Sequence, residues 1–174
     1  MKNLTFTEKL RLIIILLICA SLLFLFSYKQ SSSSVNIHIQ KVNSSSVDRK
    51  LLIAAPSSPF KDSIKVIILD RYKSPSIVVK VIDIKVLDNT KIADFDAILI
   101  MHRWEAGAPT DNVKLFMDEN VESKNKIVML TTSWDGLEKM EHIDAITGAS
   151  IVKDVPIFTE KIINRLDRLL KFKN

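Results

Sequence analysis

The chain has 174 residues, the length of about one domain, and carries a net charge of +5 at pH 7. Its basic residues form no run with interleaved aromatic side chains, so this charge gives little support to a nucleic-acid-binding function. The single cysteine, Cys19, lies inside an apolar N-terminal segment. The remainder of the chain therefore cannot form an internal disulfide or a cysteine metal site.

The apolar segment at residues 12–28 reads LIIILLICASLLFLFSY and carries no charge. As a helix it would span roughly 25 Å, close to the thickness of a bilayer core. Three basic residues precede it, and only Lys29 follows directly. By the positive-inside rule we expect residues 1–11 in the cytoplasm, a single-pass anchor in the cell membrane and an extracytoplasmic C-terminal domain. A cleaved signal peptide is the alternative, although no small-x-small cleavage site follows the run.

Residues 29–49 are rich in serine, a composition that is typical of a solvated linker. Within them Val35, Ile37 and Ile39 alternate with polar residues, a pattern that also fits a short strand. We therefore expect a linker that joins the anchor to a folded domain comprising residues 50–174.

The folded domain begins with an apolar run at residues 51–55, which predicts a buried strand. Ser58 and Pro59 follow, and a serine N-cap before a proline at the first helical position is typical of a helix start. Apolar residues then recur at helical spacing as far as Tyr72. Residues 63–72 are also β-branched enough to form one strand of a hairpin. We favour the helix because it completes a βαβ unit.

Further apolar segments alternate between strand and helix patterns. Short apolar or β-branched runs predict strands at residues 77–87, 97–102, 126–131 and 143–147. Helical spacing predicts helices at residues 110–121 and, after an N-cap at Asp154, at residues 155–170. Strands separated by helices indicate an α/β fold in which a parallel sheet is covered on both faces.

Ligands of such sheets bind beyond the carboxyl ends of the strands, near the point where the strand order reverses. Three predicted loops lie at those ends, at residues 56–61, 103–109 and 132–136. The only two tryptophans of the chain, Trp104 and Trp134, fall in two of these loops. We therefore expect the loops to form one shared pocket.

This layout, over about residues 51–170, resembles that of the flavodoxins. The resemblance implies a flavodoxin-like three-layer α/β sandwich that binds FMN, with a hydroxyl-rich loop on the phosphate and aromatic side chains on both sides of the flavin ring. Ser57 and Ser58 match the phosphate loop by position, with Lys61 as a nearby source of positive charge. Trp104 and Trp134 match the stacking aromatics, and the alternative for each is half-buried packing at a sheet edge.

The loop departs from the flavodoxin pattern, because its sequence PSSPFKDS has no glycine. Pro59 also removes one amide donor, and Asp62 opposes the charge of Lys61. The alternative is that Ser58 and Pro59 only start a helix.

A second segment, DAITGAS at residues 144–150, resembles the acceptor motif of proteins that carry FMN covalently. In those proteins the flavin is linked through its phosphate to the last hydroxyl residue, which here is Ser150. The alternative is a short strand that ends at Gly148, a residue that permits a turn into the last helix.

Two functions from different classes follow. One is a membrane-anchored flavodoxin-like protein that uses FMN to pass electrons to a membrane redox partner. The other is a flavodoxin-like domain without cofactor that acts as a membrane-tethered interaction module, and the fold alone does not choose between them. The three histidines lack metal-ligand spacing, and no Gly-x-Ser-x-Gly motif is present, so the sequence predicts neither a metal site nor catalytic residues.

Overall fold

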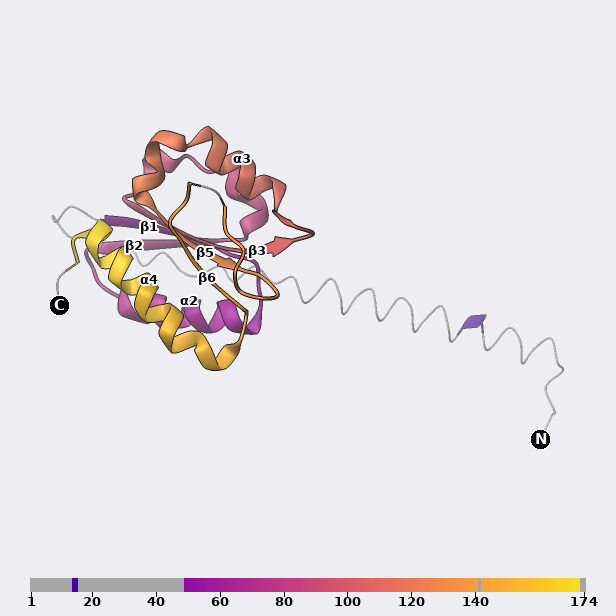
Figure 1. The fold of residues 1–174 in the computed structure, drawn as a ribbon. Coiled ribbons are helices and arrows are strands. Elements are labelled where there is room, and N and C mark those ends of the chain that lie inside the picture. Colours follow the sequence, from indigo (N-terminus) through magenta and orange to yellow (C-terminus); the bar gives the residue numbers. More distant parts are fainter. Residues whose placement is uncertain (1–13, 16–48, 141, 173–174) are drawn as a thin grey trace. The chain divides into compact units, whose positions relative to one another are not determined.

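The computed structural model describes residues 14–15, 49–140 and 142–172, and Figure 1 draws its fold. No helix among these residues is long and apolar enough to cross a membrane. The predicted anchor at residues 12–28 lies outside the described residues except at positions 14 and 15. The predicted linker, with the short strand considered within it, lies outside them except for Arg49.

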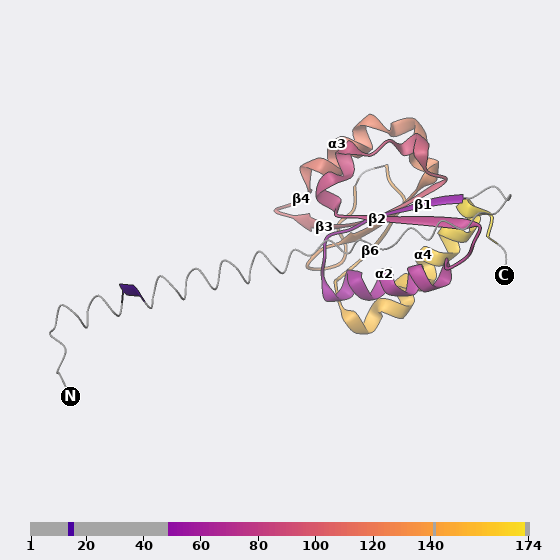
Figure 2. The same cartoon turned by 180° about the vertical axis from the view of Figure 1, so that it is seen from behind.

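A central sheet organises the domain, as Figure 1 and the reverse view in Figure 2 show. Its strands are β1 (Arg49–Ala54), β2 (Ile77–Ile82), β3 (Ala97–Glu105), β5 (Ile127–Thr132) and β6 (Ala145–Gly148). They follow the spatial order β2-β1-β3-β5-β6, and each neighbouring pair is parallel. The order reverses direction between β1 and β3, which is the doubly wound arrangement of the flavodoxin-like fold.

Helices cover both faces of this sheet, giving the three layers seen in Figure 1. On one face lie α2 (Pro59–Arg71) and α4 (Val155–Leu170), and on the other lie α3 (Asp111–Glu119) and the 3-10 helix η1 (Ile84–Asn89). Side chains alternate along each strand, so Leu99 belongs to the core under α2 and α4, whereas Ile98 belongs to the core under α3. The predicted three-layer α/β sandwich with a parallel sheet is therefore confirmed.

The structure settles the choice between helix and hairpin at residues 63–72 in favour of the helix. The Ser58 hydroxyl accepts a hydrogen bond from the backbone N–H of Lys61 at 3.2 Å, and Pro59 occupies the first turn. Ile64 and Ile68 are fully buried, whereas Val66 is exposed. Buried residues thus recur about every four positions, so one apolar face of the helix packs on the sheet. The β-branched residues of this segment therefore did not make it a strand.

Two predicted strand ends are wrong. The strand predicted at residues 77–87 ends at Ile82, because the Asp83 carboxylate accepts from the backbone N–H of Lys85 at 2.9 Å and starts η1. Such local bonding by aspartate competes with a strand ladder. The strand predicted at 97–102 instead continues to Glu105, because its end pairs antiparallel with the short strand β4 (Ala108–Pro109).

The ion pair between α2 and α4 gives a test of how the helical layer is held. The Tyr72 hydroxyl donates to an Asp167 carboxylate oxygen at 2.7 Å, and Arg71 donates to the other oxygen at 2.8 Å. Replacing Tyr72 with phenylalanine removes a hydrogen bond to a charged group, so we expect the free energy of unfolding to fall by about 2 kcal/mol. Urea denaturation measures this difference, and an unchanged midpoint would show that the bond adds no net stability.

Candidate functional site

The carboxyl ends of β1, β3, β5 and β6 meet at one edge of the sheet, which we call the C-terminal rim. The register fixes this arrangement, because Arg103 of β3 lies beside Thr132 of β5, and Thr132 lies beside Gly148 of β6. All three loops predicted to carry function leave the sheet at this rim. The expectation that they meet at one edge is thus confirmed for the backbone.

A pocket of about 840 Å³ opens at the C-terminal rim between the ends of β3, β5 and β6. Trp104, Trp134 and Ser150 all contribute to its lining, together with Arg103 and Thr132. The structure therefore brings together three of the six residues predicted to form a site. Arg103 and Thr132 are additions that the sequence interpretation did not single out, although both lie in the loops it named.

Trp134 is fully exposed, with a relative accessibility of 100%. The loop that carries it is nevertheless held by hydrogen bonds. The Asp135 carboxylate accepts from the Ser133 hydroxyl at 2.9 Å and from the backbone N–H of Leu137 at 3.0 Å. Gly136 has a φ of +75°, and a β-carbon there would stand 2.8 Å from the backbone nitrogen of Ala149. The Trp134 indole is thus exposed to solvent, whereas the backbone of its loop is fixed by these contacts.

Trp104 forms another part of the lining and is half-buried. It pairs with Pro109 across the β3–β4 hairpin, and its ring centroid lies 6.4 Å from that of His102. Its indole nitrogen is buried and has no hydrogen-bond partner in the described part of the chain. A buried N–H normally has a partner, so this donor is an unsatisfied polar group beneath the pocket wall.

Lys61 lies beneath the rim as a buried cation with a relative accessibility of 2%. Its ammonium donates to the Thr132 hydroxyl at 3.2 Å, and within residues 49–140 and 142–172 no carboxylate lies within ion-pair distance of it. Burial lowers the pKa of Lys61 to about 8; the Arg103 guanidinium acts in the same direction and Glu105 opposes it. A buried amine without a carboxylate favours an anion at the rim.

Ser57 and Ser58 do not line the pocket. The Ser57 hydroxyl donates to the Asp62 carboxylate at 2.9 Å, and the Ser58 hydroxyl caps α2 through the N–H of Lys61. The Ser57 proton is therefore donated to a carboxylate, whereas the Ser58 hydroxyl acts as the acceptor that caps α2. The predicted phosphate loop has the geometry of a helix start.

His102 is a fully buried polar residue that the sequence interpretation did not assign to the site. Its Nε2 atom lies 2.7 Å from the Thr131 hydroxyl. Burial lowers the pKa of His102 to about 4; a backbone contact to Arg103 opposes this shift and the Lys61 charge adds to it. The imidazole is therefore neutral at pH 7. It is a polar, uncharged group buried beneath the C-terminal rim.

Much of the DAITGAS segment has a structural explanation. Asp144 accepts from Arg165 at 3.2 Å, and residues 145–148 form β6. Gly148 faces the ring of Phe158 so closely that a β-carbon would overlap it. Ser150, by contrast, is exposed and lines the pocket with both tryptophans, and nothing in the packing accounts for its hydroxyl.

Because Gly148 and Phe158 are in contact, we expect the effects of substituting them on the free energy of unfolding to be non-additive. Replacing Gly148 with alanine should lower the free energy of unfolding by about 2 kcal/mol, because the added methyl overpacks the site. The double variant Gly148→Ala with Phe158→Leu should be less destabilised than the sum of the two single variants. Urea denaturation of all four proteins measures the coupling, and strict additivity would contradict the proposed contact.

Comparisons with known proteins found matches among solved structures. No protein-family model matches the sequence, and no curated protein matches it. Among solved structures, an oxidised flavodoxin from Bacillus cereus is 17% identical with a TM-score of 0.44, covering 68% of this chain and 99% of that one. The flavodiiron core of a Synechocystis sp. protein is 11% identical with a TM-score of 0.47, covering 74% of this chain and 38% of that one. The fold assignment itself rests on the strand order and pairing.

Proposed function

We propose that the domain binds FMN at the C-terminal rim and serves as an electron-transfer protein. The observation that carries this proposal is that both tryptophans and Ser150 line one pocket of about 840 Å³. This volume lies within the range of roughly 300–1,000 Å³ that is usual for sites of small molecules and cofactors. An exposed indole beside a pocket is well suited to stacking on a flat aromatic ring.

Each lining residue has a distinct part in this proposal. Trp134 stacks on the flavin ring, while Trp104 supplies aromatic surface to the pocket wall. Among the described residues that line the pocket, Arg103 is the one cation; its side chain is 69% exposed and lies 3.8 Å from the carboxylate of Glu105, which also lines the pocket. We assign the phosphate to Arg103 because it lines the pocket, whereas Ser57 and Ser58 do not. FMN supplies the redox chemistry when bound, and the protein tunes it through these contacts.

Flavin titration of the full chain tests the proposal directly. Adding the protein to FMN should quench the flavin fluorescence in a saturable manner, and the purified protein with bound flavin should be yellow. Arg103→Ala should weaken FMN binding about tenfold through loss of a charge-assisted contact, and should leave binding of riboflavin, which has no phosphate, unchanged. A colourless protein without quenching at high flavin concentration would reject the redox function.

A covalent form of the same function involves Ser150. Its hydroxyl would form a phosphoester with the FMN phosphate of FAD and release AMP, a transfer that a separate flavin transferase would catalyse. Intact-mass spectrometry should then show a gain of one FMN less one water, absent in Ser150→Ala. An unmodified Ser150 in cells that make the transferase would exclude the covalent form and leave reversible binding to the titration above.

A second candidate function is a flavodoxin-like domain without cofactor that serves as an interaction module. The specific observation in its favour is the loop after β1, where the Ser57 hydroxyl donates to the Asp62 carboxylate and the Ser58 hydroxyl caps α2. Under this function the fold is retained as a scaffold. The flavin titration separates the two candidates, because only the first predicts saturable quenching.

We further propose that residues 12–28 anchor the protein in a membrane with the folded domain on the extracytoplasmic side. The support is the uncharged apolar run and the excess of basic residues before it. A membrane redox partner of the domain would then lie at the same surface. A reporter fused after Asn174 should be active outside the cytoplasm, and a cytoplasmic reporter would reject this orientation.

A further inference from the structure

The strand β6 lies at one edge of the sheet, and its outer side has no strand partner in the described part of the chain. The carbonyl oxygen of Gly148 accepts from the backbone N–H of Ser133, so it faces the β5 side. Backbone groups alternate in direction along a strand that pairs in parallel. The N–H and C=O of Thr147 therefore point to the free edge, where an added strand would pair.

This edge lacks the features that block strand pairing. β6 contains no charged residue and no proline, whereas the opposite edge strand, β2, carries Lys80. Charged side chains and prolines on edge strands are common ways of preventing unwanted pairing. The β6 edge is thus open to an additional strand, although its four residues limit the number of backbone hydrogen bonds.

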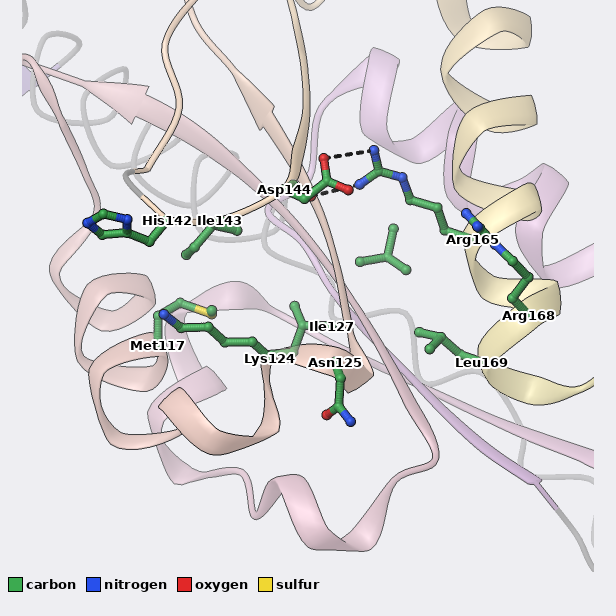
Figure 3. A pocket seen from close by; sticks show the side chains of 11 residues that line it. Met117, Lys124, Asn125, Ile127, His142, Ile143, Asp144, Arg165, Arg168 and Leu169 are labelled. Atoms are coloured by element: carbon green, nitrogen blue, oxygen red, sulfur yellow. Dashed lines mark hydrogen bonds and ion pairs between the residues drawn. The ribbon is translucent and has the colours of Figure 1, made fainter.

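Two adjoining hollows lie at the β6 edge of the sheet, and residues of α4 line both. The first, shown in Figure 3, has a volume of about 480 Å³ and lies at the beginning of β6. The second, of about 440 Å³, runs beside Ala145, Ile146 and Thr147. Arg165 and Arg168 line both hollows, so together they form one groove along the strand, which we call the β6 groove.

The β6 groove has an excess of positive charge. Lys161, Arg165 and Arg168 follow helical spacing and form one stripe along α4. Lys124 adds a fourth cation on the opposite side of the first hollow, as Figure 3 shows. Among the described residues that line the groove, the only carboxylate is that of Asp144, which is already paired with Arg165 at 3.2 Å.

We propose that the β6 groove binds an extended acidic segment of a partner protein, which adds to the sheet as a strand beside β6. Main-chain hydrogen bonds to Thr147 give the pairing, as in other cases of β-augmentation. Side chains of an extended segment alternate in direction, so carboxylates at every second position face the cations of α4. The apolar floor of the first hollow, which includes Ile127 and Leu169, takes an apolar side chain.

Synthetic peptides provide the probes. A peptide of alternating aspartate and valine should bind the full chain, measured by fluorescence anisotropy, and the affinity should fall as salt is added. A peptide of alternating lysine and valine should bind at least tenfold more weakly. The acidic peptide with N-methylated alternate amides keeps its charge but cannot pair with a strand, so it should also lose at least tenfold in affinity.

Variants of the chain locate the site. Lys161→Glu with Arg168→Glu should weaken binding of the acidic peptide on the order of tenfold or more, since two exposed ion pairs become repulsive. Lys80→Glu on the opposite edge is the matched control and should have no effect. Binding of the acidic peptide should slow amide hydrogen exchange at Thr147 in the unmodified chain, a measurement that requires no variant to fold.

Three outcomes would overturn the proposal. Absence of binding at millimolar peptide would remove the site. Equal binding of the N-methylated peptide would show that the groove attracts charge without adding a strand. Self-association of the full chain that slows exchange at Thr147 without any peptide would identify a second copy as the occupant. None of these outcomes bears on FMN, which binds at the C-terminal rim in our proposal.

Discussion

Replacing Trp134 with alanine should lower the affinity of the protein for FMN roughly ten- to hundredfold and leave its thermal midpoint unchanged. Stacking of a heteroaromatic base on a protein aromatic ring contributes roughly 1–3 kcal/mol by alanine substitution, and loss of that contact gives this range. The side chain is 100% exposed, so its removal breaks no packing. Flavin fluorescence titration and thermal denaturation of the same preparations measure both quantities.

Leu137→Ala is the matched control for this prediction. Leu137 lies three positions further along the same loop and is 76% exposed, so its substitution removes apolar surface of the loop without touching the pocket lining. We expect its FMN affinity to stay within about twofold of the unmodified protein, as for a surface change remote from the ligand. An equal loss of affinity in both variants, or in neither, would contradict the assignment of Trp134 as the stacking residue.

Replacing Lys61 with methionine should raise the free energy of unfolding at pH 7 by roughly 3 kcal/mol. Burial holds the pKa of Lys61 at about 8 in the folded state against a usual value of 10.5, and each pKa unit corresponds to about 1.4 kcal/mol. Below pH 8 the lysine is charged in both states, so the full cost of burying the charge is present. Methionine fills a similar volume without that cost.

The same pKa shift gives this prediction a pH signature. Between about pH 8 and 10.5 the folded protein releases the Lys61 proton while the unfolded chain retains it, so the stability of the unmodified protein rises with pH. The advantage of the methionine variant should therefore shrink across this range and vanish above it. Taking the difference between variants removes the contribution of Tyr72, whose raised pKa lowers stability at high pH.

Urea denaturation from pH 7 to pH 10.5 measures this difference. Lys65→Met removes a lysine of the same helix that is paired with Asp62 and whose side chain is 17% exposed, so it controls for the general effect of losing a lysine. A stability difference for Lys61→Met that is constant across the range would show that the buried amine is not the source. Weaker FMN binding by Lys61→Met would additionally support the role of this cation at the rim.

Local chemistry in the sequence was sufficient to predict most of the fold. The serine and proline at positions 58 and 59 start α2 as predicted, and the alternation of strands and helices gave the parallel sheet. The end of β2 was not predictable from propensity, because Val86 and Leu87 continue the apolar pattern after Asp83 has already turned the chain. The β3–β4 hairpin was missed because β4 has only two residues, too few to show the alternation of apolar and polar residues that indicates a strand.

The candidate site was only partly predictable from the sequence. Parallel strands bring their carboxyl ends together, which is why Trp104 and Trp134 could be placed in one pocket from their loop positions alone. The partners of individual polar atoms depend on loop conformation and were not accessible in this way. The pairing of Ser57 with Asp62, and of Lys61 with Thr132, are examples. The sequence thus predicted in which part of the fold each side chain lies, but it did not predict the hydrogen-bond partners of that side chain.

The close approach of Gly136 to Ala149 has a consequence for measurement. There is no space at that contact for even a methyl group, so the backbones of the loops after β5 and β6 touch. Ser150 follows Ala149 in one of these loops, and Trp134 lies two residues before Gly136 in the other. A group attached or bound at the serine will therefore shift the environment of the neighbouring indole, and intrinsic emission of the native protein will signal occupancy without an added dye.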